Sequence, residues 1–450
     1  MTLRPVLCTI AALLQFFSNH SPAKELSAAP PNIIFILADD MGYGDLGCFG
    51  QKKIKTPSLD QMASEGIRFT SAYAGSTVCA PSRCTLMTGL HTGHARIRGN
   101  GNGGIEPEDV TIAELLKKVG YHTGLIGKWG LGTENQPGAP NKKGFDEAFG
   151  YLNQTHAHDY YPEYLLKNGE KFFLKGNANG GRKEYSHDLF AAAALEFLEK
   201  NRSHQFFLYL PFTIPHAHID PPSDEPYSKE NWPPAERKYA AMITRLDRDI
   251  GRLFAKLKEL GLDDNTIVFF TSDNGPHHEG GGDPTFFKSA GPLRGIKRDL
   301  YEGGIREPSI VRWPGKIKAG VTSDFPWAFW DFLPTACDVA KIKAPEKIDG
   351  TSILPTLFGQ IQTPHEFLYW EFHEGGSRQA VRMSDWKAVR PVGEKLELYN
   401  LKNDFGETHD VSAQHPDIVA KIENYLKTAR TESAQWKLKP PGDKLKKKKK

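Results

Sequence analysis

The chain has 450 residues, a formal net charge of +3, 39% hydrophobic residues and 25% charged residues. This composition is typical of a soluble globular protein with enough chain for a large core. Much of the positive excess lies in the lysine run 446–450, so the net charge does not indicate a broad basic surface. We therefore expect no nucleic-acid partner. Five scattered cysteines also exclude a disulfide framework for a chain of this size.

Residues 1–29 are predicted to be a signal peptide. Arg4 supplies a positive start, residues 6–17 are mostly apolar, and small residues follow at two candidate cleavage positions. Because the apolar run is short for a bilayer span, we expect an exported protein, periplasmic or secreted, without stable membrane insertion. An uncleaved anchor is the alternative.

Residues 30–359 are predicted to form one large α/β domain. Residues 32–37 show no polar alternation, as expected for a strand of a parallel sheet that is buried on both faces. Helix signals follow at Thr56-Pro57 and at the capping box Thr111–Glu114. Further expected strands cover 121–126, 205–211 and 266–270, and further expected helices cover 186–200 and about 242–260. This alternation predicts a mostly parallel sheet flanked by helices.

Past residue 360 the pattern changes to short strands separated by turn residues. We predict strands at 367–372, 379–383, 386–390 and 396–399, and a helix that begins at Pro416. Residues 360–435 are therefore expected to form a smaller α+β domain that contains an antiparallel sheet and packs on the first domain. The lysine-rich segment 436–450 is predicted to be a disordered tail.

The segment 76–89 places a cysteine at the start of a predicted helix. It reads Ser-Thr-Val-Cys79-Ala-Pro-Ser-Arg83-Cys-Thr-Leu-Met-Thr-Gly, and its proline is tolerated in a first helical turn. Free N–H groups and the dipole at a helix N-terminus favour an anion, and Arg83 lies one turn further on. A thiol in this setting indicates a nucleophile that faces an anionic substrate. A buried or disulfide-bonded cysteine is the alternative.

Acidic side chains follow two of the predicted strands. Asp39 and Asp40 come after the first strand, and Asp273 and Asn274 come after the strand at 266–270. Ligands bind beyond the carboxyl ends of parallel strands, so these residues are expected to share one site. Four oxygen ligands suit Ca²⁺ or Mg²⁺ rather than Zn²⁺. Ordinary turn residues after strands are the alternative.

The motif Cys-x-Pro-Ser-Arg with the following Thr-Gly resembles the signature of the type I sulfatases, within the alkaline phosphatase superfamily. This resemblance implies an alkaline phosphatase-like fold and the conversion of Cys79 to Cα-formylglycine by a formylglycine-generating maturation enzyme. One hydroxyl of the aldehyde hydrate, activated by the metal and Arg83, would attack sulfur, and the other would expel sulfate. The resemblance also implies that Asp39, Asp40, Asp273 and Asn274, together with residue 79, hold Ca²⁺, with Mg²⁺ as the alternative.

The resemblance further implies roles for two lysines and a histidine. Lys128 and Lys297 resemble the lysines that contact sulfate in the family and balance charge in the transition state. His216 matches the histidine on the substrate side, which gives a proton to the departing alcohol, and His218 is its competitor.

The chain departs from the family at one position. Many members carry Gly-Lys-Trp-His, whereas this chain has Gly130 in place of that histidine. The histidine assists the formylglycine hydrate in the family, so we expect either that it is dispensable here or that another histidine enters the space. His158 or His156 is the candidate, either in that role or as a residue that binds the substrate.

The function implied by the resemblance is hydrolysis of a sulfate ester, on analogy a sulfated carbohydrate. A phosphoester or phosphonate hydrolase on the same scaffold is one alternative, which His277 and His278 keep open. The zinc-dependent phosphatase relatives, however, have histidine directly after the aspartate where this chain has Asn274. The other alternative is a non-catalytic binder of sulfated glycan, in which Cys79 stays unmodified.

Overall fold

The computed structural model describes residues 1–2, 30–101 and 103–441. The predicted signal peptide, apart from Met1 and Thr2, lies outside the described residues, and so do residues 442–450 of the predicted tail. Residues 436–441 are described, and they contact segments far away in the sequence: the Trp436 indole donates to the Arg96 carbonyl at 2.8 Å, and the Lys439 carbonyl accepts from the Ser377 amide at 2.7 Å. The predicted start of the tail at residue 436 stays a prediction.

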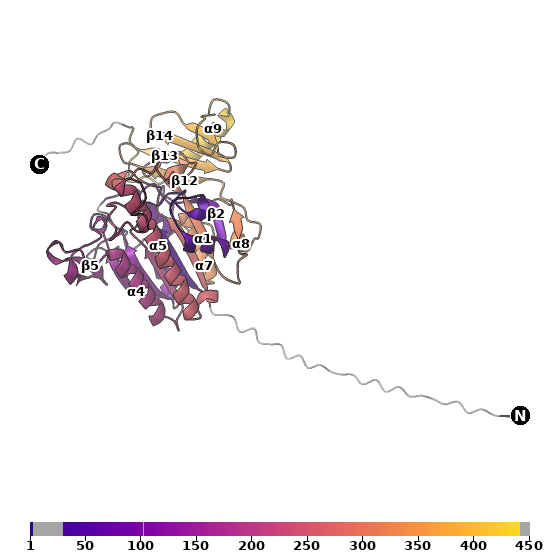
Figure 1. The fold of residues 1–450 in the computed structure, drawn as a ribbon. Coiled ribbons are helices and arrows are strands. Elements are labelled where there is room, and N and C mark those ends of the chain that lie inside the picture. The colour runs from indigo at the N-terminus through magenta and orange to yellow at the C-terminus, as the bar shows by residue number, and fades with distance from the viewer. Residues whose placement is uncertain (3–29, 102, 442–450) are drawn as a thin grey trace.

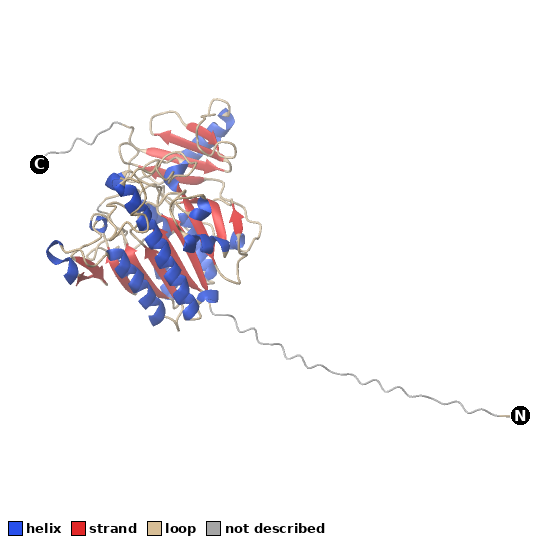
Figure 2. Ribbon diagram, viewed as in Figure 1, coloured by secondary structure: helices blue, strands red, loops and turns tan. Residues whose placement is uncertain are grey.

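A large mixed sheet forms the centre of the molecule, with helices on both faces (Figures 1 and 2). Within the described residues its eleven strands are β1 (Asn32–Ala38), β2 (Ile67–Tyr73), β3 (His122–Lys128), β4 (Glu147–Tyr151), β5 (Tyr164–Lys167), β6 (Glu170–Phe173), β7 (Phe206–Pro211), β8 (Thr266–Ser272), β9 (Arg306–Arg312), β10 (Val321–Ser323) and β11 (Trp327–Ala328). Their order across the sheet is β10-β2-β9-β8-β1-β7-β3-β4-β5-β6, with β11 beside β2.

The middle of this sheet is parallel, as the sequence predicts. Strands β8, β1, β7, β3 and β4 run in one direction. Strand β9 is antiparallel to both of its neighbours, and β5 and β6 add an antiparallel edge. The α/β architecture with a mostly parallel sheet is confirmed.

Helices cover the two faces of this sheet. The α-helices are α1 (Pro57–Ser64), α2 (Cys79–Thr88), α3 (Ile112–Lys118), α4 (Ser186–Lys200), α5 (Pro234–Glu259), α6 (Glu302–Ile305), α7 (Phe332–Val339), α8 (Leu354–Leu357) and α9 (Pro416–Leu426). Short 3₁₀ turns are η1 (Gly47–Phe49), η2 (Pro140–Lys142), η3 (His156–His158), η4 (Lys175–Gly180), η5 (Asp263–Asn265), η6 (Glu279–Gly281) and η7 (Phe329–Asp331).

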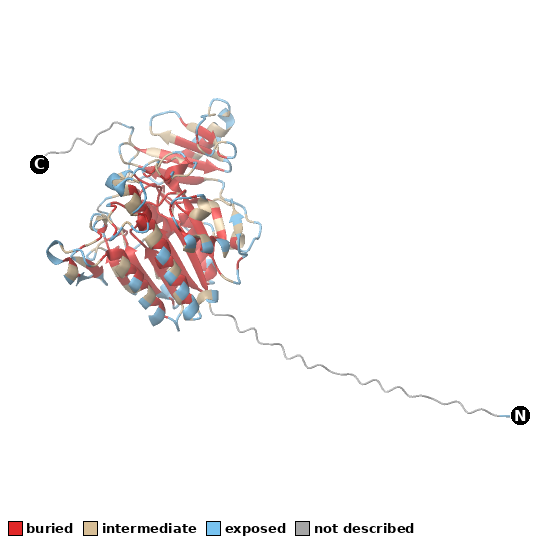
Figure 3. Ribbon diagram, viewed as in Figure 1, coloured by how far each residue is buried: buried red, intermediate tan, exposed pale blue. Residues whose placement is uncertain are grey.

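Strand β1 belongs to the apolar core on both of its faces (Figure 3). Phe35 and its alternate neighbours pack in a cluster with residues of α2, α3 and α7. Ile34 and Ile36 pack in a second cluster with residues of α1, α4 and α5. Successive side chains of a strand point to opposite faces, so a strand covered on both sides is apolar throughout. This explains why residues 32–37 show no polar alternation.

A smaller antiparallel sheet lies at one end of the molecule with α9 beside it (Figure 1). Its strands are β12 (Leu368–Phe372), β13 (Arg378–Met383), β14 (Trp386–Pro391) and β15 (Glu397–Asn400), in that order. One face packs on α9 through residues such as Val381 and Ile422. The other face packs on the large sheet and its loops through Trp370 and Tyr73. The expected antiparallel C-terminal sheet is confirmed, whereas the domain boundary near residue 360 stays a prediction.

A buried ion pair connects the small sheet to α6. The ammonium group of Lys387, on β14, is fully buried and lies 2.9 Å from a carboxylate oxygen of Glu302 and 3.5 Å from one of Glu407. Although burial raises the pKa of Glu302, the charge of Lys387 and of nearby arginines lowers it to about 2. Buried charges of this kind are stable only when they are paired.

We predict that the free energy of unfolding depends on pH through His91 at this junction. Its Nδ1 accepts a hydrogen bond from the Gly93 amide at 3.1 Å, so a proton on Nδ1 would break this bond. Burial lowers the pKa of His91 to about 4 in the folded chain, against about 6.5 in an unfolded chain. Between these values only the unfolded chain binds the proton, so the free energy of unfolding falls as the pH falls from about 6.5 to 4.

We expect this group to cost the protein about 2 to 3 kcal/mol of stability between pH 7 and pH 4.5. The measurement is urea unfolding at both pH values for the wild type and for His91→Asn, which keeps a hydrogen-bond acceptor without titrating. The variant should lose less stability on acidification by that amount. An identical loss in both proteins would contradict the prediction.

The described residues contain four cysteines, Cys48, Cys79, Cys84 and Cys337, and all four are free. Among the same residues, no helix has both the length and the apolar character needed to cross a membrane.

Candidate active site

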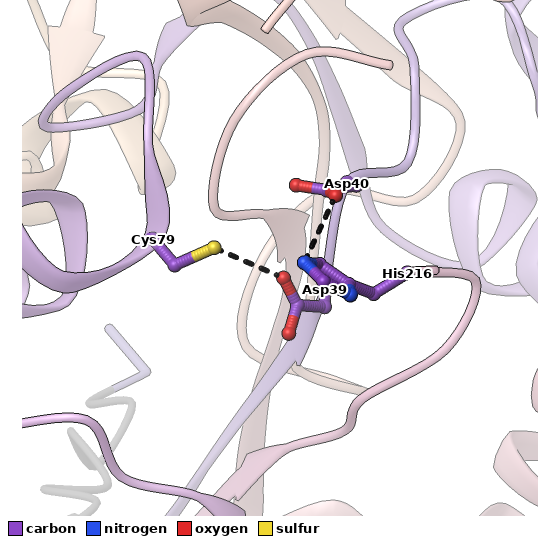
Figure 4. A group of neighbouring side chains, drawn as sticks. All are labelled: Asp39, Asp40, Cys79 and His216. Atoms are coloured by element: carbon purple, nitrogen blue, oxygen red, sulfur yellow. Dashed lines mark hydrogen bonds and ion pairs between the residues drawn. The ribbon is translucent and has the colours of Figure 1, made fainter. Parts of the chain in front are cut away.

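The polar residues predicted from the sequence meet at the carboxyl ends of the parallel strands, and Figure 4 draws four of them, Asp39, Asp40, Cys79 and His216. Asp39 and Asp40 follow β1 directly, and Asp273 and Asn274 follow β8. Ala38 pairs with Ser272 in the register of these two strands, so the acidic pairs are necessarily neighbours. Lys128 is the last residue of β3, the strand on the other side of β7.

Cys79 is the first residue of α2 and is only 1% exposed. Its thiol donates a hydrogen bond to Oδ1 of Asp39 over 3.4 Å, the contact drawn in Figure 4. Burial, and then the negative charge of Asp39, raise the pKa of Cys79 well above its ordinary value. The unmodified side chain is therefore a neutral thiol, which is a poor nucleophile.

The N-terminus of α2 is less open to an anion than the sequence predicts. Val78 provides no side-chain cap, and Pro81 has no N–H. The amide of Ala80 donates to Oδ1 of Asn100 at 3.0 Å, and the amide of Ser82 donates to the Val78 carbonyl at 3.3 Å. Asn100, which the sequence analysis did not single out, thus satisfies one of the free donors near Cys79.

The guanidinium of Arg83 binds two carboxylates and the backbone carbonyl at the end of β3. Its Nε and Nη2 donate to one oxygen of Asp273 at 3.0 and 2.7 Å, and Nη2 lies 3.2 Å from Asp39. Its Nη1 donates to the carbonyl of Lys128 at 2.5 Å. Because the guanidinium is fully buried among these groups, it fixes the ends of β1, β8 and β3 relative to one another.

Both predicted lysines lie in the site and each one contacts an aspartate. The Nζ of Lys128 is 2.7 Å from Asp39, and the Nζ of Lys297 is 2.7 Å from Asp40. Burial lowers the pKa of each lysine, but the neighbouring aspartate more than compensates, so both pKa values lie above their ordinary range. The two ammonium groups therefore stay charged at neutral pH.

His216 is the histidine that the fold brings into the centre of the site. Its Nδ1 donates to the carbonyl of Ala217, which leaves Nε2 facing Lys297 at 3.3 Å and Asp40 at 3.4 Å. Burial lowers the pKa of His216 to about 4 despite the two nearby carboxylates. The ring of His158 stands perpendicular to it with 4.5 Å between centroids.

The two other histidines lie further out. His218 is exposed, and its Nδ1 lies 3.1 Å from the carbonyl of His158. His156 packs against the rings of Tyr151 and Tyr164, at 5.0 and 4.8 Å. Of the predicted substrate-binding residues, His158 thus touches the central group and His218 lies at its edge.

The acidic cluster fits a bound hard cation. Asp39, Asp40, Asp273 and Asn274 are all 0% exposed, and Oδ1 of Asn274 has no hydrogen-bond partner among the described residues. Burial, followed by the charge of Asp39, raises the pKa of Asp273 to about 7, which reflects the cost of crowding carboxylates. Asp40 also adopts a left-handed backbone with φ of 63°, typical of strained functional positions. A Ca²⁺ or Mg²⁺ ion would satisfy the orphaned oxygen and offset these charges.

Comparison with known proteins identifies the family. A family model described as Sulfatase matches residues 31–342, and one described as N-sulphoglucosamine sulphohydrolase, C-terminal, matches residues 296–432. N-acetylgalactosamine-6-sulfatase of Mus musculus is 35% identical over 394 residues, which cover 80% of this chain and 72% of that protein. The chain belongs to the sulfatase family.

Two further relatives support the assignment of this chain to the sulfatase family. Arylsulfatase A of Homo sapiens is 33% identical over 384 residues, covering 76% of this chain and 71% of that protein. The crystal structure of Ps i-CgsB in complex with k-i-k-neocarrahexaose has a TM-score of 0.80 and 31% identity, with 89% of this chain and 92% of that chain covered. The protein is accordingly a sulfuric ester hydrolase of the alkaline phosphatase superfamily.

The space at Gly130 of this sulfatase is filled by a residue that the sequence analysis missed. Gly130 has a φ of 78°, and a Cβ built on it would lie 2.4 Å from Nε2 of Gln154. Neither His156 nor His158 is among the atoms nearest to that position. The one sequence signal for Gln154 is its place beside the histidines of the segment 153–158.

Proposed function

We propose that this sulfatase is an exported enzyme that removes a sulfate group from a carbohydrate. The observation that carries the reaction is the convergence of Cys79, three aspartates and two lysines at one buried point. Support for the carbohydrate comes from relatives: one is named for a sulfated amino sugar, and another was solved with a neocarrahexaose. Residues 1–29 would direct export, residues 30–359 would carry catalysis, and residues 360–435 would complete the substrate pocket.

Two groups are proposed to complete the site. Asp39, Asp40, Asp273, Asn274 and residue 79 would hold Ca²⁺, with Mg²⁺ as the alternative; when bound, the ion supplies positive charge that offsets the carboxylates and stabilises a developing anion. A maturation enzyme would convert Cys79 to Cα-formylglycine, whose hydrate supplies one hydroxyl to attack sulfur and a second to expel sulfate. A cysteine or serine lacks the second hydroxyl.

The chain's own residues would then bind the ester and move one proton. Lys128 and Lys297 are charged and buried, so they can balance the negative charge that builds on the sulfate oxygens. His216 has its Nδ1–H fixed on a backbone carbonyl and a lowered pKa, so Nε2 is the ring atom that would have to take up a proton, which it could then pass to the departing alcohol. Arg83 would hold the carboxylates in place, and His158 and His218 would contact the carbohydrate at the entrance.

The test combines peptide mass with turnover. On protein from its native host, we expect the tryptic peptide that contains residue 79 to be lighter by the difference between CH₂SH and CHO. We also expect hydrolysis of sulfated oligosaccharides and aryl sulfates, loss of activity on chelation, and recovery when Ca²⁺ returns. Faster hydrolysis of the matching phosphate esters would favour a phosphohydrolase. An intact thiol with glycan binding but no turnover would favour a binding protein.

A further inference from the structure

A cavity lies between the large sheet and the small sheet, and we call it the junction cavity. Its volume is about 590 Å³, within the roughly 300–1,000 Å³ of typical ligand pockets. Most of the residues that line it come from β2, the start of β9, the segment between β10 and β11, and the ends of β13 and β15. Of the described residues that line it, none belongs to the active site.

Several strands separate the junction cavity from the catalytic cluster. Thr70 and Ser71 of β2 line the cavity, and β2 lies three positions from β1 in the sheet order. Neighbouring strands are about 4.8 Å apart, so about 14 Å lie between β2 and the strand that carries Asp39. Strands β2 and β8 are both antiparallel to β9, so β2 ends at the same edge of the sheet as β1 and β8. A long ligand could therefore reach both places along this edge.

Arg382 is a buried cation in the wall of the junction cavity, with only 8% of the residue exposed. Its Nε donates to the Ser384 carbonyl at 3.0 Å, and its Nη1 donates to the Tyr73 hydroxyl at 2.7 Å. Among the described residues Nη2 has no hydrogen-bond acceptor and no ion-pair partner, yet the atom is not closed off from solvent. A guanidinium that is mostly buried and keeps free N–H groups presents a donor to an anion in the cavity.

Arg306 lines the same cavity and is equally buried, but its three nitrogens are all occupied. Its Nε donates to the Thr70 carbonyl at 2.6 Å, its Nη1 to Glu302 at 3.1 Å and its Nη2 to the Ser71 hydroxyl at 3.1 Å. Arg306 therefore holds the wall together, whereas Arg382 keeps a nitrogen for a ligand.

The other side chains of the junction cavity suit a sugar better than a free inorganic anion. The exposed side chain of Lys402 adds a second cation. The side chains of Asp324 and Asp385 are exposed, and neither makes a hydrogen bond or an ion pair with another described residue. Carboxylates accept hydrogen bonds from hydroxyl groups, and the half-buried Phe325 offers apolar surface to the C–H face of a sugar ring. An inorganic anion would use only the cations.

We propose that the junction cavity binds a sulfated sugar unit of the substrate chain other than the unit that is hydrolysed, with Nη2 of Arg382 donating to its sulfate group. This inference rests on the proposed hydrolysis of a sulfated carbohydrate. When one chain occupies both places, the second contact becomes intramolecular, so the chain is held more tightly than by either contact alone. The enzyme therefore favours polymers over short fragments, which cannot span both places.

The experiment compares Arg382→Gln and Asp385→Trp with the wild type. The first variant removes the free donor, and the second fills the cavity without removing a side-chain contact. Glu394→Trp is the matched control, because Glu394 is an exposed carboxylate in the next turn of the same sheet and does not line the cavity. Melting temperature reports on folding. If Arg382→Gln unfolds because its contact with Tyr73 is lost, Asp385→Trp decides the question alone.

Binding of carrageenan, chondroitin sulfate and inorganic sulfate is measured by calorimetry in a Cys79→Ala background, which prevents turnover. Because a hydrogen bond to a charged group is removed, we expect Arg382→Gln to bind the preferred polysaccharide about 10- to 100-fold more weakly. Asp385→Trp should lose at least as much. In chains that carry Cys79 and are matured in cells, KM for that polysaccharide should rise by a similar factor, while kcat and both constants on an aryl sulfate stay unchanged. Glu394→Trp should match the wild type throughout.

Polysaccharide binding within twofold of the wild type in Asp385→Trp would overturn the inference, and so would a wild type that binds neither polysaccharide. Variants that lose binding of inorganic sulfate but keep polysaccharide binding would identify a site for a free anion, which also contradicts the inference. An effect of Asp385→Trp without one of Arg382→Gln would overturn the role of Arg382. A wild type that hydrolyses no sulfate ester, but whose polysaccharide binding depends on the junction cavity, would overturn the proposed function instead.

Discussion

Cys79→Ser is expected to abolish turnover of sulfate esters while leaving the fold intact. A serine at the start of α2 offers one hydroxyl where the hydrated aldehyde would offer two, so a sulfated enzyme has no internal route to release sulfate. Loss of an activated nucleophile lowers kcat by on the order of 10⁴-fold or more. The measurements are kcat on an aryl sulfate and the intact mass of the protein, which should show one added SO₃ group after incubation with substrate.

Cys84→Ala is the matched control for this variant. Cys84 lies on the same helix, is equally buried and belongs to the apolar cluster under the sheet rather than to the site. Its loss removes a small side chain from the core, so stability should fall modestly while activity per folded molecule stays within about twofold. Wild-type turnover by Cys79→Ser would rule out the aldehyde and would require another nucleophile.

Lys297→Ala is expected to lower kcat by about 10² to 10³-fold, the range for removing one fixed charge from an electrostatic site. Lys297 is the group that stands between Asp40 and Nε2 of His216, at 2.7 and 3.3 Å. Without it, the sulfate loses a positive partner and the site keeps an uncompensated carboxylate. Steady-state kinetics should show a lower kcat together with a higher KM, and Lys297→Arg should restore part of the activity.

Lys318→Ala provides the control, because Lys318 is an exposed lysine far from the acidic cluster in the sequence. Its removal should leave both kinetic constants unchanged. If Lys297→Ala retained wild-type kcat, the ammonium group would be structural, and the charge on the sulfate would have to be balanced by Lys128 and Arg83.

Residues at strand ends could be predicted from the sequence because their local signals are unambiguous. The uniformly apolar stretch before Asp39 and the one before Asp273 both indicate buried parallel strands, and the turn residues after them must lie at one edge of the sheet. The placement of Cys79 at a helix start follows in the same way from the proline in its first turn.

Features that depend on contacts between distant segments could not be predicted. Strand β9 has the sequence Arg-Glu-Pro-Ser-Ile-Val-Arg, which is polar and contains a proline. Its arginines are nevertheless buried in pairs with Glu302 and Asp263, and Pro308 lies opposite the register shift of β2. A proline is tolerated at such an irregularity. Only the assembled sheet shows these compensations.

The neighbours of Arg83 and Gln154 in the folded chain could not be predicted for the same reason. Periodicity places Arg83 on one face of a helix, but the carboxylates it binds come from two other strands. Gln154 lies in a loop without a motif, and its amide can lie where it does because Gly130 has no side chain. Long-range partners of single polar groups leave no periodic trace in a sequence.

The buried pairing of Lys387 with Glu302 bears on how far the two parts of such a chain can be exchanged during evolution. Glu302 begins α6, in the segment that also carries Lys297, while Lys387 belongs to the small sheet. A C-terminal segment from a relative without a cation at this place would remove one of the cations paired with Glu302 and would leave Arg306, at 3.1 Å, as its partner. Because breaking a buried ion pair is destabilising, such a chimera would lose part of the roughly 5 to 15 kcal/mol that stabilises a folded domain. Recombination between members would therefore preserve the two residues as a matched pair, and the small sheet would be inherited together with the loop that bears the active-site lysine.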